Sequence, residues 1–123
     1  MVGGKRRILV VEDDPTVCLV LRDALEDEGY TIRVARNGAQ ALAALEEWQP
    51  DVIVLDLLLP AVNGREFRTQ QLVHPEHARV PVVLLSAVQD LPVEAARLGA
   101  AAALAKPFDL DELLATVRAV LPR

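Results

Sequence analysis

The chain has 123 residues, of which 52% are hydrophobic and 25% charged, and its net charge is −5. This composition is typical of one ordered globular domain and excludes a disordered chain. The negative charge argues against direct nucleic-acid binding, because such surfaces are normally basic. The single cysteine, Cys18, excludes an internal disulfide and fits a reducing compartment. No apolar run approaches the about 20 residues of a membrane helix. We therefore expect one cytoplasmic domain over residues 1–123, without membrane insertion and with residues 1–6 as a flexible lead-in.

Short apolar runs alternate with helical stripes along the chain. Four runs that contain Val, Ile or Leu predict strands at residues 8–11, 31–35, 52–55 and 82–85, and a fifth strand is predicted at the alanine-rich residues 100–105. The last of these is the least regular, because alanine favours a helix. Only its position between a helix and Lys106-Pro107 favours a strand.

Five helices are predicted between and after these strands. Asp14-Pro15 begins the first, which Gly29 ends, and Asn37-Gly38 begins the second. The others cover residues 65–72, residues 91–98, and a last segment that starts at Asp109 and runs to about residue 121. Residues 60–64 and the polar segment 73–79 are expected to be loops. The alternation predicts an α/β fold, with a parallel sheet covered by helices on both faces.

Polar residues stand at the carboxyl ends of four of the predicted strands. They are Glu12, Asp13, Asp56, Ser86 and Lys106. In a doubly wound sheet these ends meet at one edge, where ligands bind. Three carboxylates brought together repel one another and attract a hard divalent cation such as Mg²⁺ or Mn²⁺. The edge of the sheet is therefore the candidate site.

The chemistry of this set points to phosphoryl transfer. Asp56 is a carboxylate nucleophile that can form an acyl phosphate. Lys106 supplies a compact charge for a phosphoryl oxygen, and Ser86 can donate a hydrogen bond to another. Taken singly, each residue has an ordinary reading: a capping or turn acid, a surface lysine, a satisfied hydroxyl. Only their convergence on one edge favours the functional reading.

Four groups of residues resemble the receiver domain of bacterial two-component response regulators. They are Glu12-Asp13, Asp56 with Pro60 and Gly64, Ser86-Ala87, and Lys106-Pro107-Phe108. The similarity runs from Ile8 to Leu121 and implies a flavodoxin-like sheet with strand order 2-1-3-4-5. It also implies a phosphoacceptor that catalyses its own phosphorylation and dephosphorylation and is not an enzyme in the usual sense.

The resemblance assigns a role to each matched position. Asp56 accepts the phosphoryl group from a sensor histidine kinase or a histidine phosphotransfer protein. Asp13 binds the metal directly, Glu12 binds it through water, and the backbone carbonyl of Leu58 adds a ligand. Ser86 is the switch hydroxyl, Lys106 is the conserved-type lysine of the family, and the Lys106-Pro107 bond is expected to be cis.

The sequence also departs from the family pattern. The switch aromatic three residues before Lys106 is replaced by Ala103, and the helix at 91–98 is short and contains Pro92. Leu58 and Val88 occupy positions that tune dephosphorylation in the family, and both are apolar. We therefore expect slow loss of the phosphoryl group.

The implied partner surface is the face formed by residues 91–98, residues 100–105 and the last helix. A downstream effector protein or domain would bind there. A homodimer is a further expected assembly. One alternative is a phosphorylation-independent docking module, which Ala103 and the short helix favour. A second is a small Asp-nucleophile phosphatase, which Leu58 opposes because an acid is needed at that position. Flavin binding is opposed by the lack of a phosphate loop after the first strand.

Overall fold

The computed structural model describes residues 5–58 and 63–121. Five parallel strands form one sheet in the order β2-β1-β3-β4-β5. Their bounds are β1 Arg7–Val11, β2 Thr31–Ala35, β3 Val52–Leu55, β4 Val82–Ser86 and β5 Ala102–Ala105. This confirms the predicted flavodoxin-like order. Most of the expected lead-in at 1–6 and of the expected loop at 60–64 lies outside the described residues.

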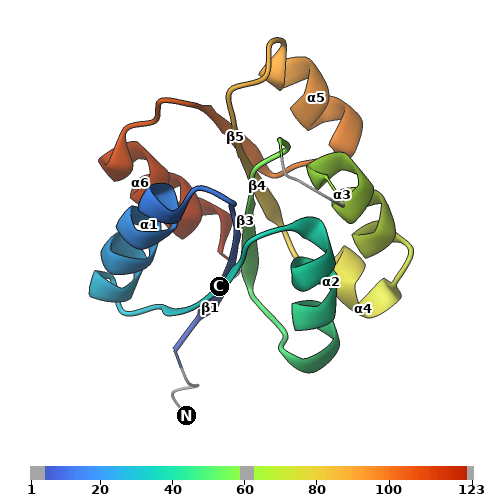
Figure 1. The fold of residues 1–123 in the computed structure, drawn as a ribbon, viewed down its shortest axis with the longest axis horizontal. Helices are drawn as coiled ribbons and strands as arrows, with labels where there is room; N and C mark the ends of the chain where they lie inside the picture. Colours follow the sequence, from blue (N-terminus) through green and yellow to red (C-terminus); the bar gives the residue numbers. More distant parts are fainter. Residues whose placement is uncertain (1–4, 59–62, 122–123) are drawn as a thin grey trace.

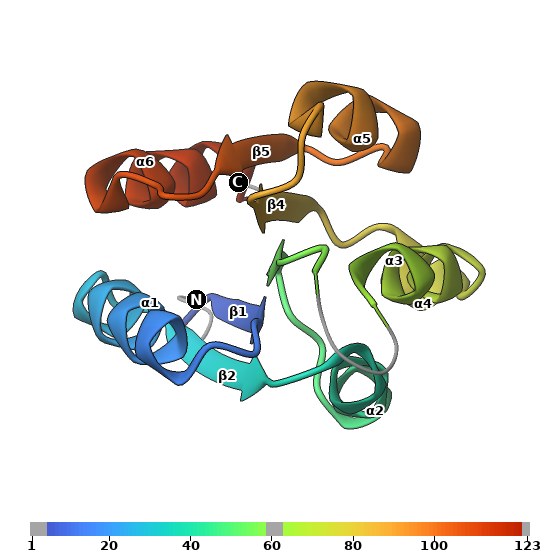
Figure 2. The same ribbon diagram turned by 45° about the horizontal axis from the view of Figure 1, so that its top comes forward.

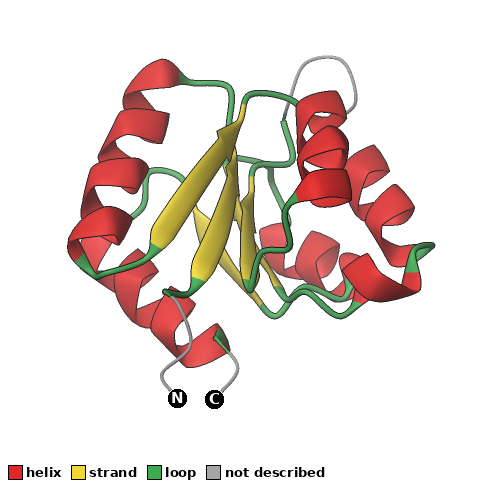
Figure 3. Ribbon diagram, turned by 90° about the horizontal axis from the view of Figure 1, so that it is seen from below, coloured by secondary structure: helices red, strands yellow, loops and turns green. Residues whose placement is uncertain are grey.

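Helices cover both faces of the sheet (Figures 1 and 2). Within the described ranges they are α1 Pro15–Asp27, α2 Gly38–Glu47, α3 Gly64–Leu72, α4 Pro75–Ala78, α5 Leu91–Leu98 and α6 Leu110–Val120. One face carries α1 and α6, and the other carries α2, α3, α4 and α5; Figure 3 shows the sheet between the two layers. None of these helices is long and apolar enough to cross a membrane.

The burial of the strands explains the sheet order. Every residue of β3 and β4 is buried, as are Ile8 to Val11 of β1, so these strands lie in the centre. Strands buried on both faces are typical of parallel sheets. At the edges, β2 and β5 are partly exposed. The predicted inner and edge strands are thus in place, and the carboxyl ends of β1 and β3 lie side by side at the centre.

Short polar side chains fix the starts of four helices. Each accepts a hydrogen bond from a backbone N–H in the first turn, which satisfies donors that have no partner inside the helix. The capping residues are Asp14 of α1, Asn37 of α2, Asn63 of α3 and Asp109 of α6. The predicted starts at Asp14-Pro15, Asn37-Gly38 and Asp109 are confirmed.

The loop predicted for residues 73–79 is wrong in part, because α4 occupies Pro75–Ala78 and raises the number of helices in the described part of the chain from five to six. Pro75 stands at the start of this helix, where its fixed backbone angle is favourable. The short helix is held from below by Gln71, whose Nε2 donates to the carbonyl oxygens of His77 and Val80 at 2.8 and 3.1 Å. A polar composition alone does not reveal such support.

Strand β5 confirms the choice of position over propensity. Ala103 pairs with Leu84 of β4, and Ala105 pairs with Ser86. The hydrogen bonds of the ladder outweigh the modest helix preference of alanine, which is below 1 kcal/mol per residue relative to poor helix formers. The strand is shorter than predicted, because it begins at Ala102.

Candidate functional site

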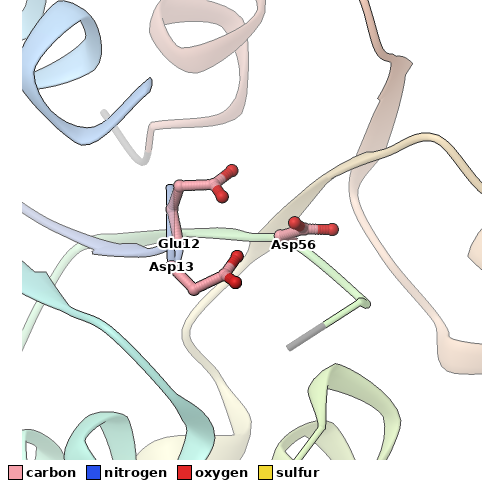
Figure 4. Close-up of side chains that lie close together, drawn as sticks. All are labelled: Glu12, Asp13 and Asp56. Atoms are coloured by element: carbon pink, nitrogen blue, oxygen red, sulfur yellow. The ribbon is translucent and has the colours of Figure 1, made fainter. Parts of the chain in front are cut away.

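The carboxyl ends of the central strands bring the predicted polar residues to one edge. Glu12 and Asp13 follow β1, and Asp56 follows β3. Figure 4 shows that these three side chains lie close together. One carboxylate oxygen from each lies within 4.8 Å of the others. The structure therefore brings together the acids that the sequence pattern selected.

The three acids differ in their exposure. Glu12 is 1% exposed and Asp56 5% exposed, whereas Asp13 is exposed to solvent. Burial raises the pKa of Glu12 above its ordinary value, and this effect outweighs the opposing hydrogen bonds from Lys106 and from the backbone N–H of Asp14. A cluster with two buried carboxylates requires positive charge.

Lys106 supplies that charge from the end of β5. Its Nζ donates to Glu12 Oε1 at 2.6 Å and to Asp56 Oδ2 at 3.0 Å. Burial acts to lower the pKa of Lys106, but the hydrogen bonds with the two carboxylates outweigh it and the net pKa is raised. Lys106 is therefore held as an ammonium between the two buried acids. Its bond to Pro107 is cis, as expected.

Asp56 is held by its own backbone as well as by Lys106. Its N–H donates to the carbonyl oxygen of Val11 at 3.0 Å, which continues the ladder between β1 and β3. Its Oδ1 accepts from the N–H of Leu58 at 3.0 Å. One carboxylate oxygen therefore faces a backbone donor and the other faces the ammonium, which fixes the orientation of the group.

Helix α3 begins directly against Asp56. The N–H of Gly64 donates to the carbonyl oxygen of Leu57 at 3.1 Å. A Cβ atom at position 64 would lie 2.6 Å from the carbonyl oxygen of Asp56 and 2.5 Å from Cα of Leu57. Any side chain there would push the two backbones apart, so glycine is required by close approach.

The remaining predicted residues lie around this centre. Ser86 is fully buried at the end of β4, and its Oγ accepts from the N–H of Val88 at 3.4 Å. Ala103 is partly buried in β5 and packs against the core on the side of α2, α3 and α5. The Leu58 side chain is exposed, while its N–H contacts Asp56. The metal-ligand and switch roles of these residues remain predictions.

Two side chains that the sequence did not connect with the site hold the loop between β1 and α1. Cys18 Sγ donates to the carbonyl oxygen of Glu12 at 3.1 Å, and an Arg36 guanidinium nitrogen donates to the carbonyl oxygen of Asp13 at 3.0 Å. Cys18 is buried, and burial raises the pKa of its thiol. No sequence pattern pointed to Arg36, because its contact spans 23 positions.

The donor set fits a hard divalent cation. All three clustered groups offer carboxylate oxygens, the ligands that Mg²⁺ and Mn²⁺ prefer, and the exposed Asp13 leaves room for bound water. No nitrogen or sulfur ligand belongs to the cluster among the described residues. The residues therefore fit magnesium chemistry and give no reason to expect a soft metal.

Comparison with known proteins agrees with this geometry. The family model described as the response regulator receiver domain matches residues 8–118. Sporulation initiation phosphotransferase F of Bacillus subtilis is 34% identical over 116 residues, which are 94% of this chain and 94% of that protein. Seven other curated relatives are longer: the chain spans 46–52% of their length.

Solved structures give the same result. The chemotaxis response regulator CheY4 of Vibrio cholerae superposes with a TM-score of 0.88 at 28% identity, over 95% of this chain and 99% of that one. The response regulator TrrA of Thermotoga maritima, solved in complex with Mg²⁺-BeF, has a TM-score of 0.83 at 30% identity, over 94% and 99% of the two chains. Fold, acid cluster and sequence agree, and the chain belongs to the family of response regulator receiver domains.

Proposed function

We propose that Asp56 is the phosphoacceptor of this receiver domain. The donor is the phosphohistidine of a sensor histidine kinase or of a histidine phosphotransfer protein. The observation that carries the proposal is the fixed placement of Asp56, 95% buried at the end of β3 with Lys106 Nζ 3.0 Å from Oδ2. Burying a carboxylate beside an ammonium and two further acids costs desolvation free energy. Such arrangements are therefore typical of functional sites.

The transfer forms one bond and breaks another. A carboxylate oxygen of Asp56 attacks phosphorus, the P–N bond to the donor histidine breaks, and the imidazole nitrogen leaves with the electron pair. The product is an acyl phosphate on Asp56. Lys106, which donates to the Asp56 carboxylate, would move its ammonium to a phosphoryl oxygen, and the buried hydroxyl of Ser86 would donate to another.

The cluster would hold Mg²⁺ or Mn²⁺ during this step. Asp13 would bind the ion directly, Glu12 through water, and Asp56 and the Leu58 carbonyl would complete the protein ligands. When bound, the ion supplies neutralisation of the charge on the transferring group. Lys106 donates to both Glu12 and Asp56, so these two carboxylates already face one common positive charge.

The output is proposed to be a change in a protein-binding face. The face is made by α5, β5 and α6, and the partner is a downstream effector protein or domain, with pairing of two copies as a further use. Ser86 ends β4 and pairs with Ala105 of β5, so a change at Ser86 would act on that strand. We place the protein in the cytoplasm, where its kinase or phosphotransfer partner would deliver phosphate.

Uptake of phosphate from acetyl phosphate tests the proposal. With Mg²⁺ present, intact mass spectrometry should show a single added phosphoryl group, and chelation of the metal should abolish it. Asp56→Asn should not be modified. Asp51→Asn is the matched control, because Asp51 lies at the other end of β3, where it accepts from the N–H of Arg7. Equal labelling of wild type and Asp56→Asn would rule out Asp56 as the acceptor.

A phosphorylation-independent docking module is the second candidate. The observation that favours it is Ala103, which leaves β5 without the aromatic side chain expected at the switch position. If Asp56 takes up no phosphate while an effector still binds the α5-β5-α6 face, this candidate replaces the first. A phosphatase is disfavoured, because the Leu58 side chain supplies no acid; turnover of a simple phosphomonoester would reverse that judgement.

A further inference from the structure

The loop between β1 and α1 is fixed through the backbone carbonyls of its two acids. Cys18 Sγ holds the carbonyl oxygen of Glu12, and the Arg36 guanidinium holds that of Asp13, at 3.1 and 3.0 Å. The next residue, Asp14, caps α1 by accepting from the N–H groups of Thr16 and Val17. Each residue of the loop therefore has an anchor of its own.

Asp13 depends on its backbone anchor more than its neighbours do. The carboxylate of Glu12 is held by Lys106 and by the N–H of Asp14, and that of Asp56 by Lys106 and the N–H of Leu58. Within residues 5–58 and 63–121, the carboxylate of Asp13 receives no hydrogen bond and is exposed. The position of the Asp13 carboxylate is thus set by the peptide that Arg36 contacts.

Arg36 is itself well placed for this contact. It directly follows β2, where the carbonyl oxygen of Ala35 accepts from the N–H of Glu12 at 3.0 Å. The N–H of Arg36 donates to Oε1 of Gln40 in the first turn of α2, at 2.8 Å. The backbone at Arg36 is therefore fixed by hydrogen bonds to β1 and to α2. The Arg36 side chain extends from the end of β2 to the loop that follows β1.

We propose that Arg36 is a positioning residue for the divalent cation, which acts by holding the Asp13 peptide so that the Asp13 carboxylate faces the site. The proposal rests on the metal-binding role given to Asp13 under the proposed function. Arg36 does not ligate the ion and does not touch the phosphoryl group. Its removal would let the Asp13 peptide move, and the ion would lose a preorganised ligand.

The charge of Arg36 and its hydrogen bond affect Mg²⁺ affinity in opposite directions. Whether the loss of Arg36 weakens or tightens Mg²⁺ binding therefore shows which of the two dominates. A guanidinium near a cation site repels the ion, so loss of charge alone would tighten binding. Loss of the hydrogen bond to the Asp13 carbonyl would weaken it. Salt separates the two, because the repulsion is screened at 0.15 M ionic strength over about 8 Å while a short hydrogen bond is much less affected.

Direct calorimetric titration of the metal-free protein with Mg²⁺, at about 0.15 M ionic strength, tests the proposal. The amide nitrogen of glutamine lies two bonds closer to the backbone than the Arg36 nitrogen that donates to Asp13. Arg36→Gln should therefore lose this contact and raise the dissociation constant about fivefold, the scale of one lost hydrogen bond. Arg22→Gln is the matched control: Arg22 lines the same surface pocket beside Arg36 but pairs with Glu26, and its loss should change affinity less than twofold. Arg36→Lys keeps the charge and carries its N–H donors on a longer side chain than glutamine, so it should bind Mg²⁺ more tightly than Arg36→Gln.

Kinetics and stability give independent readings. For uptake of phosphate from acetyl phosphate, Arg36→Gln should raise the Mg²⁺ concentration needed for half-maximal rate and leave the rate at saturating Mg²⁺ within twofold of wild type. Thermal midpoints without metal should be alike for the Arg36→Gln and Arg22→Gln proteins, because both side chains lie at the surface.

Several outcomes would overturn the proposal. They are unchanged or tighter Mg²⁺ binding by Arg36→Gln, a loss of affinity equal to that of Arg22→Gln, and an Arg36→Lys protein that binds no better than Arg36→Gln. Failure of the proposed function is distinguishable, because it appears in the wild type: a wild-type chain that binds no Mg²⁺ overturns both proposals, whereas one that binds Mg²⁺ equally well without Arg36 overturns only this one.

Discussion

Lys106 shows how one residue can determine the charge state of the site. It lies between Glu12 and Asp56, which are almost fully buried, and its own side chain is 22% exposed. Burial of the two carboxylates is tolerated because the ammonium donates to both. Removal of the Lys106 ammonium would leave two buried acids facing each other. This would lower the stability of the fold by more than the loss of the hydrogen bonds alone.

Lys106→Met should therefore destabilise the metal-free protein at pH 7 by about 2 kcal/mol. The folded state raises the pKa of Lys106, so its contribution is fully present below the ordinary value of 10.5 and is lost as the pH rises through the higher folded value. The difference between wild type and variant should hold from neutral pH to about 10.5 and narrow above it. Urea unfolding over this range measures it.

Lys5→Met is the control, because Lys5 is exposed ahead of β1 and removal of its charge should leave stability within about 0.5 kcal/mol. A gap between wild type and Lys106→Met that widened above pH 10.5 would contradict the assignment of the ammonium.

Leu58 bears on how long the phosphoryl group lasts. Its side chain is exposed next to Asp56 and has no group that could hold an attacking water. We expect slow hydrolysis in the wild type and, for Leu58→Asn, hydrolysis roughly tenfold faster, equivalent to one gained hydrogen bond in the transition state. The decay of labelled protein after removal of acetyl phosphate measures this.

Leu72→Asn, which alters an exposed leucine at the end of α3, should leave the rate unchanged. Equal decay of the two variants and the wild type would show that position 58 does not control access of water.

At the scale of elements, α3 is joined to α5 by two arginines. The Arg65 side chain pairs with Glu94, and this lowers the pKa of the Glu94 carboxyl. Arg68 is 5% exposed and donates to the carbonyl oxygens of Leu98 and Gly99 at 2.9 and 3.0 Å. Positive charge at the carboxyl end of α5 matches the helix dipole. Because α3 begins against Asp56, these bonds connect the site to the proposed output face without the missing aromatic.

Arg68→Ala should lower the free energy of unfolding by about 2 kcal/mol, because three hydrogen bonds are lost, two of them to partly buried carbonyls and one to the buried side chain of Gln71. Chemical denaturation measures the change. The control is Arg97→Ala, since Arg97 is exposed on α5 and its loss should cost less than about 0.5 kcal/mol. If the two variants were equally stable, the carbonyl contacts of Arg68 would contribute nothing.

Sequence patterns predicted the local features and missed the contacts between distant segments. The strands, the caps at Asp14 and Asp109 and the acids at the strand ends all follow from neighbouring residues. Arg68 and Gln71 appear as ordinary polar positions of a surface helix, and both are buried by segments that come later in the chain. Helix α4 was missed because it is held by hydrogen bonds from the buried Gln71 side chain, which the sequence pattern does not reveal. Arg36 was missed because its partner, the Asp13 carbonyl, lies in another βα unit.

At the scale of the whole molecule, the topology decides which groups meet. Strand order β2-β1-β3-β4-β5 places β1 beside β3, so Glu12 and Asp13 meet Asp56 although more than 40 positions separate them. Lys106 arrives from the outer strand β5. Such an assembly of like charges stores repulsion in the fold, and a ligand that relieves the repulsion stabilises the entire chain.

Mg²⁺ should therefore raise the thermal midpoint of the protein. At a Mg²⁺ concentration 100 times the dissociation constant, the free energy of unfolding increases by about 2.7 kcal/mol. Asp13→Asn should abolish most of it. Asp14→Asn is the control, since it removes the same charge from the adjacent residue while asparagine still caps α1. Scanning calorimetry with and without Mg²⁺ decides, and an equal Mg²⁺ response of both variants would place the ion elsewhere.

The placement of Lys106 also affects how the protein can be labelled. The chain contains two lysines, Lys5 and Lys106, against eleven arginines. Amine-selective reagents therefore have one exposed lysine to attack at the beginning of the chain and one that is held, protonated, between two carboxylates. The reactivity of Lys106 toward such a reagent, followed by mass spectrometry with Lys5 as an internal standard, would report when the ammonium leaves Glu12 and Asp56.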